Sequence, residues 1–97
     1  MNKFSHKGSF TKRNIDKIPV DKPIIYKIKN LAGENVYTGI AKKGRVPKRL
    51  GEHLPGSKDA IPGAKTFSIK QKLSIESAKR EEKRVIKDEN PKYNEQE

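Results

Sequence analysis

Apolar and polar residues alternate over two neighbouring segments in the first half of the chain. Residues 24–29 read IIYKIK, and β-branched and aromatic residues in this alternating pattern are typical of a β-strand. Residues 30–35 contain Asn, Gly and Glu and predict a turn. Residues 36–40 read VYTGI and predict a second strand, so the two segments together predict a β-hairpin.

Three further elements follow in the second half. Val46 and Leu50 have helical spacing, and Pro55-Gly56 ends a predicted helix over 46–54. Residues 65–70 alternate again and predict a third strand. Residues 75–89 contain no helix breaker, follow a plausible N-cap at Ser74, and stop at Asn90-Pro91. The order β-β-α-β-α predicts an α+β domain around a small sheet.

The first 22 residues show no sustained period of either 2 or 3.6. They carry six Lys and Arg against two Asp, a net charge of +4. We expect residues 1–22 to form a basic, flexible N-terminal arm that adds phosphate contacts, and residues 23–97 to form the folded domain. The alternative for the first segment is an ordinary N-terminal tail.

Composition narrows the class of protein. The 97 residues are enough for one small domain, and the net charge of +11 favours a polyanionic partner, nucleic acid before an anionic membrane surface. The chain has no cysteine, which excludes a disulfide framework and a cysteine-based zinc site. No apolar run is long enough to span a membrane, and residues 1–4 do not begin a secretory signal, so we expect a cytoplasmic protein.

One carboxylate stands out in the predicted helix over 75–89. With about 100° per residue, Ala78, Val85 and Ile86 form an apolar stripe with Ile75, and Glu82 falls within it. A carboxylate that faces a core is costly unless it is paired or binds a metal. Glu82 is therefore either a rim residue that pairs with a Lys or Arg, or part of a site.

The helix over 46–54 carries two polar residues on one face. Arg49 and His53 are four residues apart and share a side of the helix. They are either a surface pair or part of a site, and His53 also fits a half-buried position beside Leu50. A concentrated basic region surrounds them, made of Lys42, Lys43, Arg45 and Lys48.

Tyr26 and Tyr37 lie on the two strands of the predicted hairpin. Both fit a core position, but a buried phenol needs a partner for its hydroxyl. A phenol acts as a base near neutral pH only if neighbouring cations lower its pKa from about 10. Two phenols beside an arginine and a carboxylate would then form an acid–base cluster.

These residues, taken together, resemble the GIY-YIG nuclease superfamily. The resemblance is carried by Ile24-Ile25-Tyr26, by Val36-Tyr37-Thr38-Gly39, by the run from Lys48 to His53, and by Glu82 followed by Pro91-Lys92-Tyr93-Asn94. The resemblance covers residues 23–94. Within the superfamily, this segment is similar to the nuclease domain of the bacterial excision-repair incision subunit. The resemblance implies a three-stranded antiparallel sheet flanked by helices.

The resemblance also implies hydrolysis of DNA phosphodiester bonds with one Mg²⁺ or Mn²⁺ ion. Tyr26 would be the general base or would orient the attacking water, and Tyr37 would line the site near the scissile phosphate. Arg49 would neutralise charge in the transition state. His53 matches a position that is often polar.

Two further roles are implied by the C-terminal part of the motif. Glu82 would bind the metal, and Asn94 would form a hydrogen bond within the site. A lone carboxylate suits Mg²⁺, which keeps several waters. The first motif has Ile24 in place of its glycine, which leaves the level of activity open.

The main alternative is a nucleic-acid-binding module of the same fold without significant catalysis. A ribosome- or membrane-associated basic protein would explain the charge but not Glu82. DNA is the expected partner, and the sequence leaves RNA, a targeting protein partner and the oligomeric state open. Only the N-terminal arm and the loops over 41–48 and 55–65 offer specificity, so we expect low sequence specificity or recognition of DNA shape.

Overall fold

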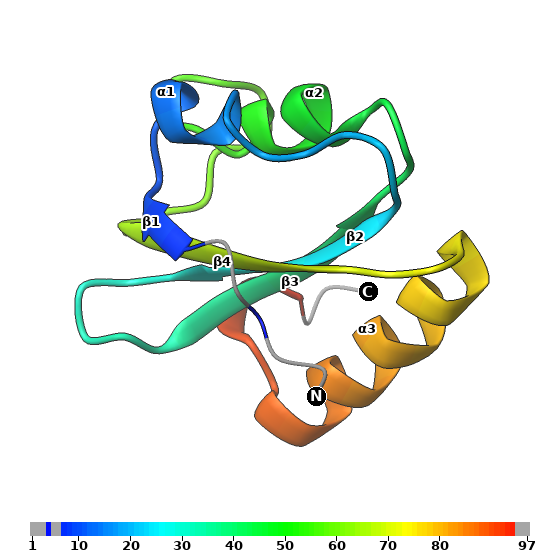
Figure 1. The fold of residues 1–97 in the computed structure, drawn as a ribbon. Coiled ribbons are helices and arrows are strands. Elements are labelled where there is room, and N and C mark those ends of the chain that lie inside the picture. Colours follow the sequence, from blue (N-terminus) through cyan, green and yellow to red (C-terminus); the bar gives the residue numbers. More distant parts are fainter. Residues whose placement is uncertain (1–3, 5–6, 95–97) are drawn as a thin grey trace.

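The computed structural model describes residue 4 and residues 7–94. Four antiparallel strands form one sheet in the order β1-β4-β2-β3. The strands are β1 (Lys7–Ser9), β2 (Ile24–Lys29), β3 (Asn35–Ala41) and β4 (Thr66–Gln71). The helices α1 (Lys12–Ile15) and α2 (Val46–Gly51) cover one face, and α3 (Ile75–Glu89) covers the other (Figure 1). A short 3-10 helix, η1 (Lys92–Asn94), follows α3.

The expected α+β class is confirmed, and the expected number of strands is wrong. Three strands were predicted, and β1 adds a fourth beside β4, with Lys7 opposite Ser68 and Ser9 opposite Thr66. The helix predicted over 46–54 ends at Gly51. The helix predicted over 75–89 has those bounds, and the Ser74 hydroxyl accepts a hydrogen bond from the Ser77 amide at 3.1 Å.

Residues 7–18 belong to the folded unit, in contrast to the flexible arm predicted for residues 1–22. Phe10, Ile15 and Ile18 are buried in the main core, and the Phe10 ring lies 6.1 Å from the ring of Phe67. The Thr11 hydroxyl caps α1 by accepting from the Asn14 amide. Residues 1–3 and 5–6 of the predicted arm lie outside the described residues.

Strand β2 lies between β4 and β3, so both of its edges are paired within the sheet. Tyr26 and its neighbours in alternation belong to the main core, which also contains Val46 and Leu50 of α2. Ile25 is fully buried, and so is Ala78 of α3. Helix α3 contacts β3 and β2, so it covers the sheet on the side opposite α2.

The buried carboxylate of α3 is Glu81. The buried residues of this helix are Ala78, Glu81 and Val85, whereas Glu82 is half-buried. Glu81 is 9% exposed and forms ion pairs with Lys70 and, at 2.6 Å, with Lys72. The sequence placed Glu82 in the middle of the apolar stripe, and that placement is wrong. The stripe is centred on the Ala78–Glu81–Val85 side, which leaves Glu82 on the flank.

Among the described residues, no helix has the length and apolar character that crossing a membrane requires.

Candidate functional site

The Tyr26 side chain extends across the neighbouring edge strand. In the β2–β3 register Tyr26 lies opposite Gly39, and β3 is at the edge of the sheet. A Cβ atom placed on Gly39 would lie 2.5 Å from the Tyr26 Oη and 2.7 Å from its Cζ. The tyrosine therefore occupies the space that any side chain at position 39 would fill. The absence of a side chain on Gly39 lets a residue of an inner strand bring its hydroxyl toward the sheet edge.

The Tyr26 hydroxyl begins a chain of hydrogen bonds. Its Oη lies 3.0 Å from His53 Nε2, and His53 Nδ1 lies 3.0 Å from the backbone oxygen of Asp59. A carbonyl oxygen only accepts, so Nδ1 carries the proton. In the neutral imidazole Nε2 is then the acceptor, and Tyr26 donates to it. The backbone of the 55–64 loop thus sets the tautomer of His53.

Burial keeps both members of this pair neutral. Burial raises the pKa of the Tyr26 phenol far above its ordinary value, and Tyr37 raises it further, while the positive charge of Arg49 opposes this shift. Burial also lowers the pKa of His53, although its bond to Asp59 opposes that shift. The sequence-based expectation that cations make Tyr26 a base is therefore not supported. His53 is the better proton acceptor of the two.

Tyr37 and Arg49 stand at the border of an open pocket. The Tyr37 ring lies 4.7 Å from the His53 ring and 6.3 Å from the Tyr26 ring. Arg49 binds Glu52 at 2.9 Å and leaves 41% of its side chain exposed. The pocket has a volume of about 430 Å³, and its lining comprises Tyr37, Arg49, His53, Lys58, Asp59, Ala60, Ile61, Pro62 and Tyr93.

Glu82 lies on α3. It is half-buried, and its negative charge contributes to the raised pKa of Tyr26, which places it within electrostatic range of the hydroxyl. In the described part of the chain, no three His, Asp or Glu side chains gather as a metal-binding group. One carboxylate fits Mg²⁺ only where water and substrate supply the other ligands. Glu81 is not a second ligand, since it is held by Lys70 and Lys72.

Asn94 joins the C-terminal segment to the edge strand. Its Oδ1 accepts from the Thr38 amide at 2.8 Å, and its Nδ2 donates to the Thr38 carbonyl at 3.0 Å. Asn94 thus replaces a missing neighbouring strand at the position between Tyr37 and Gly39. Its hydrogen bonds are made to the backbone of β3, and they fix the strand that carries the cluster.

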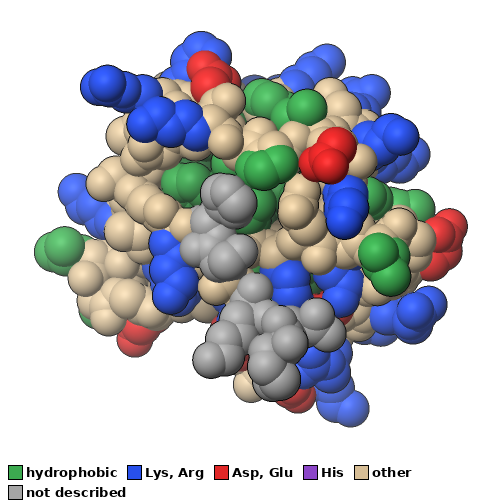
Figure 2. Space-filling view, in the orientation of Figure 1, with side chains coloured by type: hydrophobic (Ala, Val, Ile, Leu, Met, Phe, Trp, Pro, Cys, Tyr) green, Lys and Arg blue, Asp and Glu red, His purple; other side chains and the backbone are tan. Residues whose placement is uncertain are grey.

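The basic residues predicted to bind nucleic acid lie in two different settings. Lys42 and Arg45 line a second pocket that also includes Arg49. Lys43 and Lys48 are exposed to solvent and line neither this pocket nor that of Tyr37. Lys and Arg side chains surround much of the face shown in Figure 2, with fewer acidic side chains between them.

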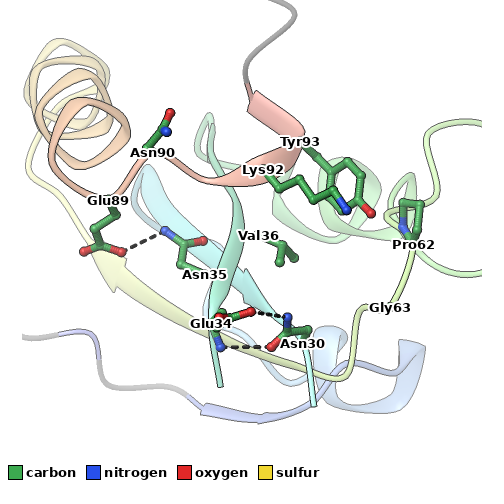
Figure 3. A pocket seen from close by; sticks show the side chains of 10 residues that line it. All are labelled: Asn30, Glu34, Asn35, Val36, Pro62, Gly63, Glu89, Asn90, Lys92 and Tyr93. Atoms are coloured by element: carbon green, nitrogen blue, oxygen red, sulfur yellow. Dashed lines mark hydrogen bonds between the residues drawn. The ribbon is translucent and has the colours of Figure 1, made fainter. Parts of the chain in front are cut away.

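A larger pocket of about 600 Å³ lies at the start of β3 (Figure 3). It contains Glu34 and Glu89, which bind Asn30 and Asn35 respectively. It contains no member of the Tyr26–His53 pair, and its two carboxylates oppose a polyanion. The smaller pocket, which combines Arg49 and Lys58 with the cluster, is the better candidate for a phosphate ester.

Sequence reasoning missed three contributions to this site. It did not single out Lys58, which lies within the 55–65 loop, and it did not assign a role to Tyr93. It also could not identify the Asp59 carbonyl, because every residue has a carbonyl and only the fold selects one. Comparisons with family models, curated proteins and solved structures found no match to this chain.

Proposed function

We propose that the protein is a metal-dependent endonuclease of the GIY-YIG type that hydrolyses phosphodiester bonds in DNA. The observation that carries this proposal is the Tyr26–His53–Asp59 hydrogen-bond chain, whose His53 lines one pocket together with the cations Arg49 and Lys58. The motif resemblance and the net charge of +11 support it.

The first step requires removal of a proton from the attacking water. The Tyr26 proton passes to His53 Nε2 while Oη takes the proton of the water, whose oxygen attacks the phosphorus. The bond from phosphorus to the leaving oxygen then breaks, and that oxygen takes a proton from solvent. His53 acts as the base and Tyr26 relays the proton, which is consistent with the directions of their pKa shifts.

Arg49 provides both charge and access. The Tyr26 side chain has no exposed surface, and Arg49 lies close enough to oppose its raised pKa. A guanidinium binds phosphate oxygens in a bidentate manner, so we expect Arg49 to move from Glu52 onto the phosphate. This movement brings positive charge to the developing oxyanion and gives water access to Oη.

Glu82 would hold the divalent ion. A bound Mg²⁺ or Mn²⁺ supplies Lewis-acid stabilisation of negative charge on phosphate oxygens. Glu82 is the carboxylate whose negative charge contributes to the raised pKa of the Tyr26 phenol, and we expect it to be the protein ligand of the ion.

A nucleic-acid-binding module without significant catalysis is the second candidate. The complete burial of Tyr26 favours it, because a covered hydroxyl cannot contact water unless the residues around it move. In this case DNA binding would be salt-sensitive and independent of Glu82.

The test is nicking of supercoiled plasmid with Mg²⁺ or Mn²⁺. The Glu82→Gln variant is compared with Glu76→Gln, an exposed carboxylate on the first turn of the same helix. The proposal expects nicking by the native protein and by Glu76→Gln, with a loss of at least about 100-fold in Glu82→Gln. An inactive native protein, or equal rates for the two variants, would overturn it. DNA binding without nicking would favour the second candidate.

A further inference from the structure

A second pocket adjoins the candidate active site on the other side of Arg49. Its volume is about 310 Å³, and its lining comprises Ile40, Ala41, Lys42, Arg45, Arg49, Ile75 and Lys79. Three elements meet there: the end of β3, the start of α2 and the start of α3. Arg49 also lines the pocket of Tyr37 and His53, so the two pockets share this residue.

The second pocket combines an apolar surface with positively charged side chains. Ile40, Ala41 and Ile75 give it an aliphatic floor, and Lys42, Arg45 and Lys79 provide cations. These three cations are exposed, and none forms an ion pair with another residue in the part of the chain that the structure describes. Apolar surface beside unpaired cations matches a nucleotide, whose deoxyribose carbons and base faces are apolar and whose phosphate is anionic.

The direction of β3 relates this pocket to the candidate active site. Tyr37 lines the first pocket, Gly39 lies against the Tyr26 hydroxyl, and Ile40 and Ala41 line the second pocket. Four residues of extended strand from Tyr37 to Ala41 span roughly 13 Å. Successive phosphates of one DNA strand advance by about 3.4 Å along the helix axis, so this distance covers a few nucleotides.

We propose that the Ile40–Ile75 pocket holds a nucleotide of the DNA strand next to the scissile phosphate, with its sugar or base on the aliphatic floor and its phosphate on Lys42, Arg45 and Lys79. This inference rests on the proposed function for the position of the scissile phosphate. It assigns Lys79 of α3 to substrate binding. It also gives Lys42 and Arg45, which line the pocket, a different role from Lys43 and Lys48, which do not.

Binding without divalent metal tests the pocket apart from cleavage. A fluorescein-labelled 12-base-pair DNA duplex is titrated with native protein, with Lys79→Ala and with Lys65→Ala. Lys65 is exposed and lines neither of the two pockets that share Arg49, and each variant removes one positive charge. Loss of one phosphate contact weakens binding by about eightfold at 0.1 M salt and lowers the salt slope by about 0.9.

We expect this loss in Lys79→Ala and a change of less than about twofold in Lys65→Ala. The Cδ1 methyl signals of Ile40 and Ile75 in NMR spectra should shift on addition of the same duplex. Equal affinities of the two variants, or unshifted methyl signals at saturating DNA, would overturn the inference. Plasmid nicking without an effect of Lys79→Ala defeats only the pocket, whereas binding through the pocket without nicking defeats only the endonuclease.

Discussion

Replacing Gly39 with alanine tests the position of the Tyr26 hydroxyl. The new Cβ would lie 2.5 Å from Oη, so the hydroxyl would have to move by about 1 Å to restore ordinary contact. Tyr26 is fully buried, and its bond to His53 is 3.0 Å long. A displacement of this size stretches the bond beyond the usual range.

The expected cost follows from two effects. Overpacking of a core costs about 1–3 kcal/mol, and loss of a buried hydrogen bond costs about 1–3 kcal/mol. Together we expect Gly39→Ala to lower the free energy of unfolding by about 2–4 kcal/mol, since the two effects are not fully additive. For a chain of this length the melting temperature falls by roughly 10–30 °C. The rate of plasmid nicking should fall about 100-fold, the usual contribution of a general base.

Urea unfolding and nicking are measured together for each variant. Gly51→Ala is the matched control, because beyond its chain neighbours and its own helix backbone nothing lies within 4 Å of the position a Cβ would take there. This control should leave stability unchanged or raise it by up to about 1 kcal/mol. Adding Tyr26→Phe to Gly39→Ala removes the closest contact, so the double variant should lose less stability than the sum of the single variants. An unchanged urea midpoint in Gly39→Ala, or additive losses in the double variant, would refute the geometry.

Three further predictions concern His53, Glu81 and Asn94. The pKa of His53 is lowered, so the folded state favours the neutral imidazole. Stability and the nicking rate should both be complete above about pH 6.5 and should fall as the pH drops through the lowered pKa. A nicking rate that rises with acidity would contradict the proton relay from Tyr26 to His53. Glu81→Gln should lower the free energy of unfolding in urea by about 2–4 kcal/mol, because it leaves the largely buried Lys70 and Lys72 without their counter-charge. A stability equal to that of the native protein would contradict the structural role of Glu81. The lysine hydrogen bonds lower the pKa of Glu81 against the effect of its burial, so this contribution is complete above about pH 4.5 and lost as the pH falls through the lowered pKa. Asn94→Ala should lower the free energy of unfolding by about 1–3 kcal/mol and speed hydrogen exchange of the Thr38 amide. An unchanged exchange rate would contradict the role of Asn94 in fixing β3.

Local signals were enough to predict the helix that carries Glu82. Ser74 caps it, and Asn90 ends it in a left-handed conformation with φ of 49°, just before Pro91. Such signals depend on neighbours in the sequence. The burial of Glu81 was not predicted, because it depends on Lys70 and on the face of the sheet that the helix covers. A helical wheel gives relative directions around the axis and leaves the direction of the core undefined.

The N-terminal segment shows the same limit more strongly. Phe10, Ile15 and Ile18 are too irregularly spaced to predict an element, yet they complete the core beside Phe67. In the site, spacing and residue types singled out Tyr26 and His53 separately, and the hydrogen bond between them was not predicted. The proton positions on that pair depend on a backbone carbonyl of a loop, which no pattern of side chains reveals.

The pairing of β1 with β4 has a consequence for synthesis of the chain. Ser68, the partner of Lys7, is added to the growing chain 61 residues after it. At about 5–20 residues per second, this delay is roughly 3–12 seconds, far longer than the time a local helix takes to form. During this time Phe10 and Ile15 have no β4 against which to pack. Strand β1 is therefore made well before the strand that fixes it in place, and completion of the sheet is a late, long-range step of folding.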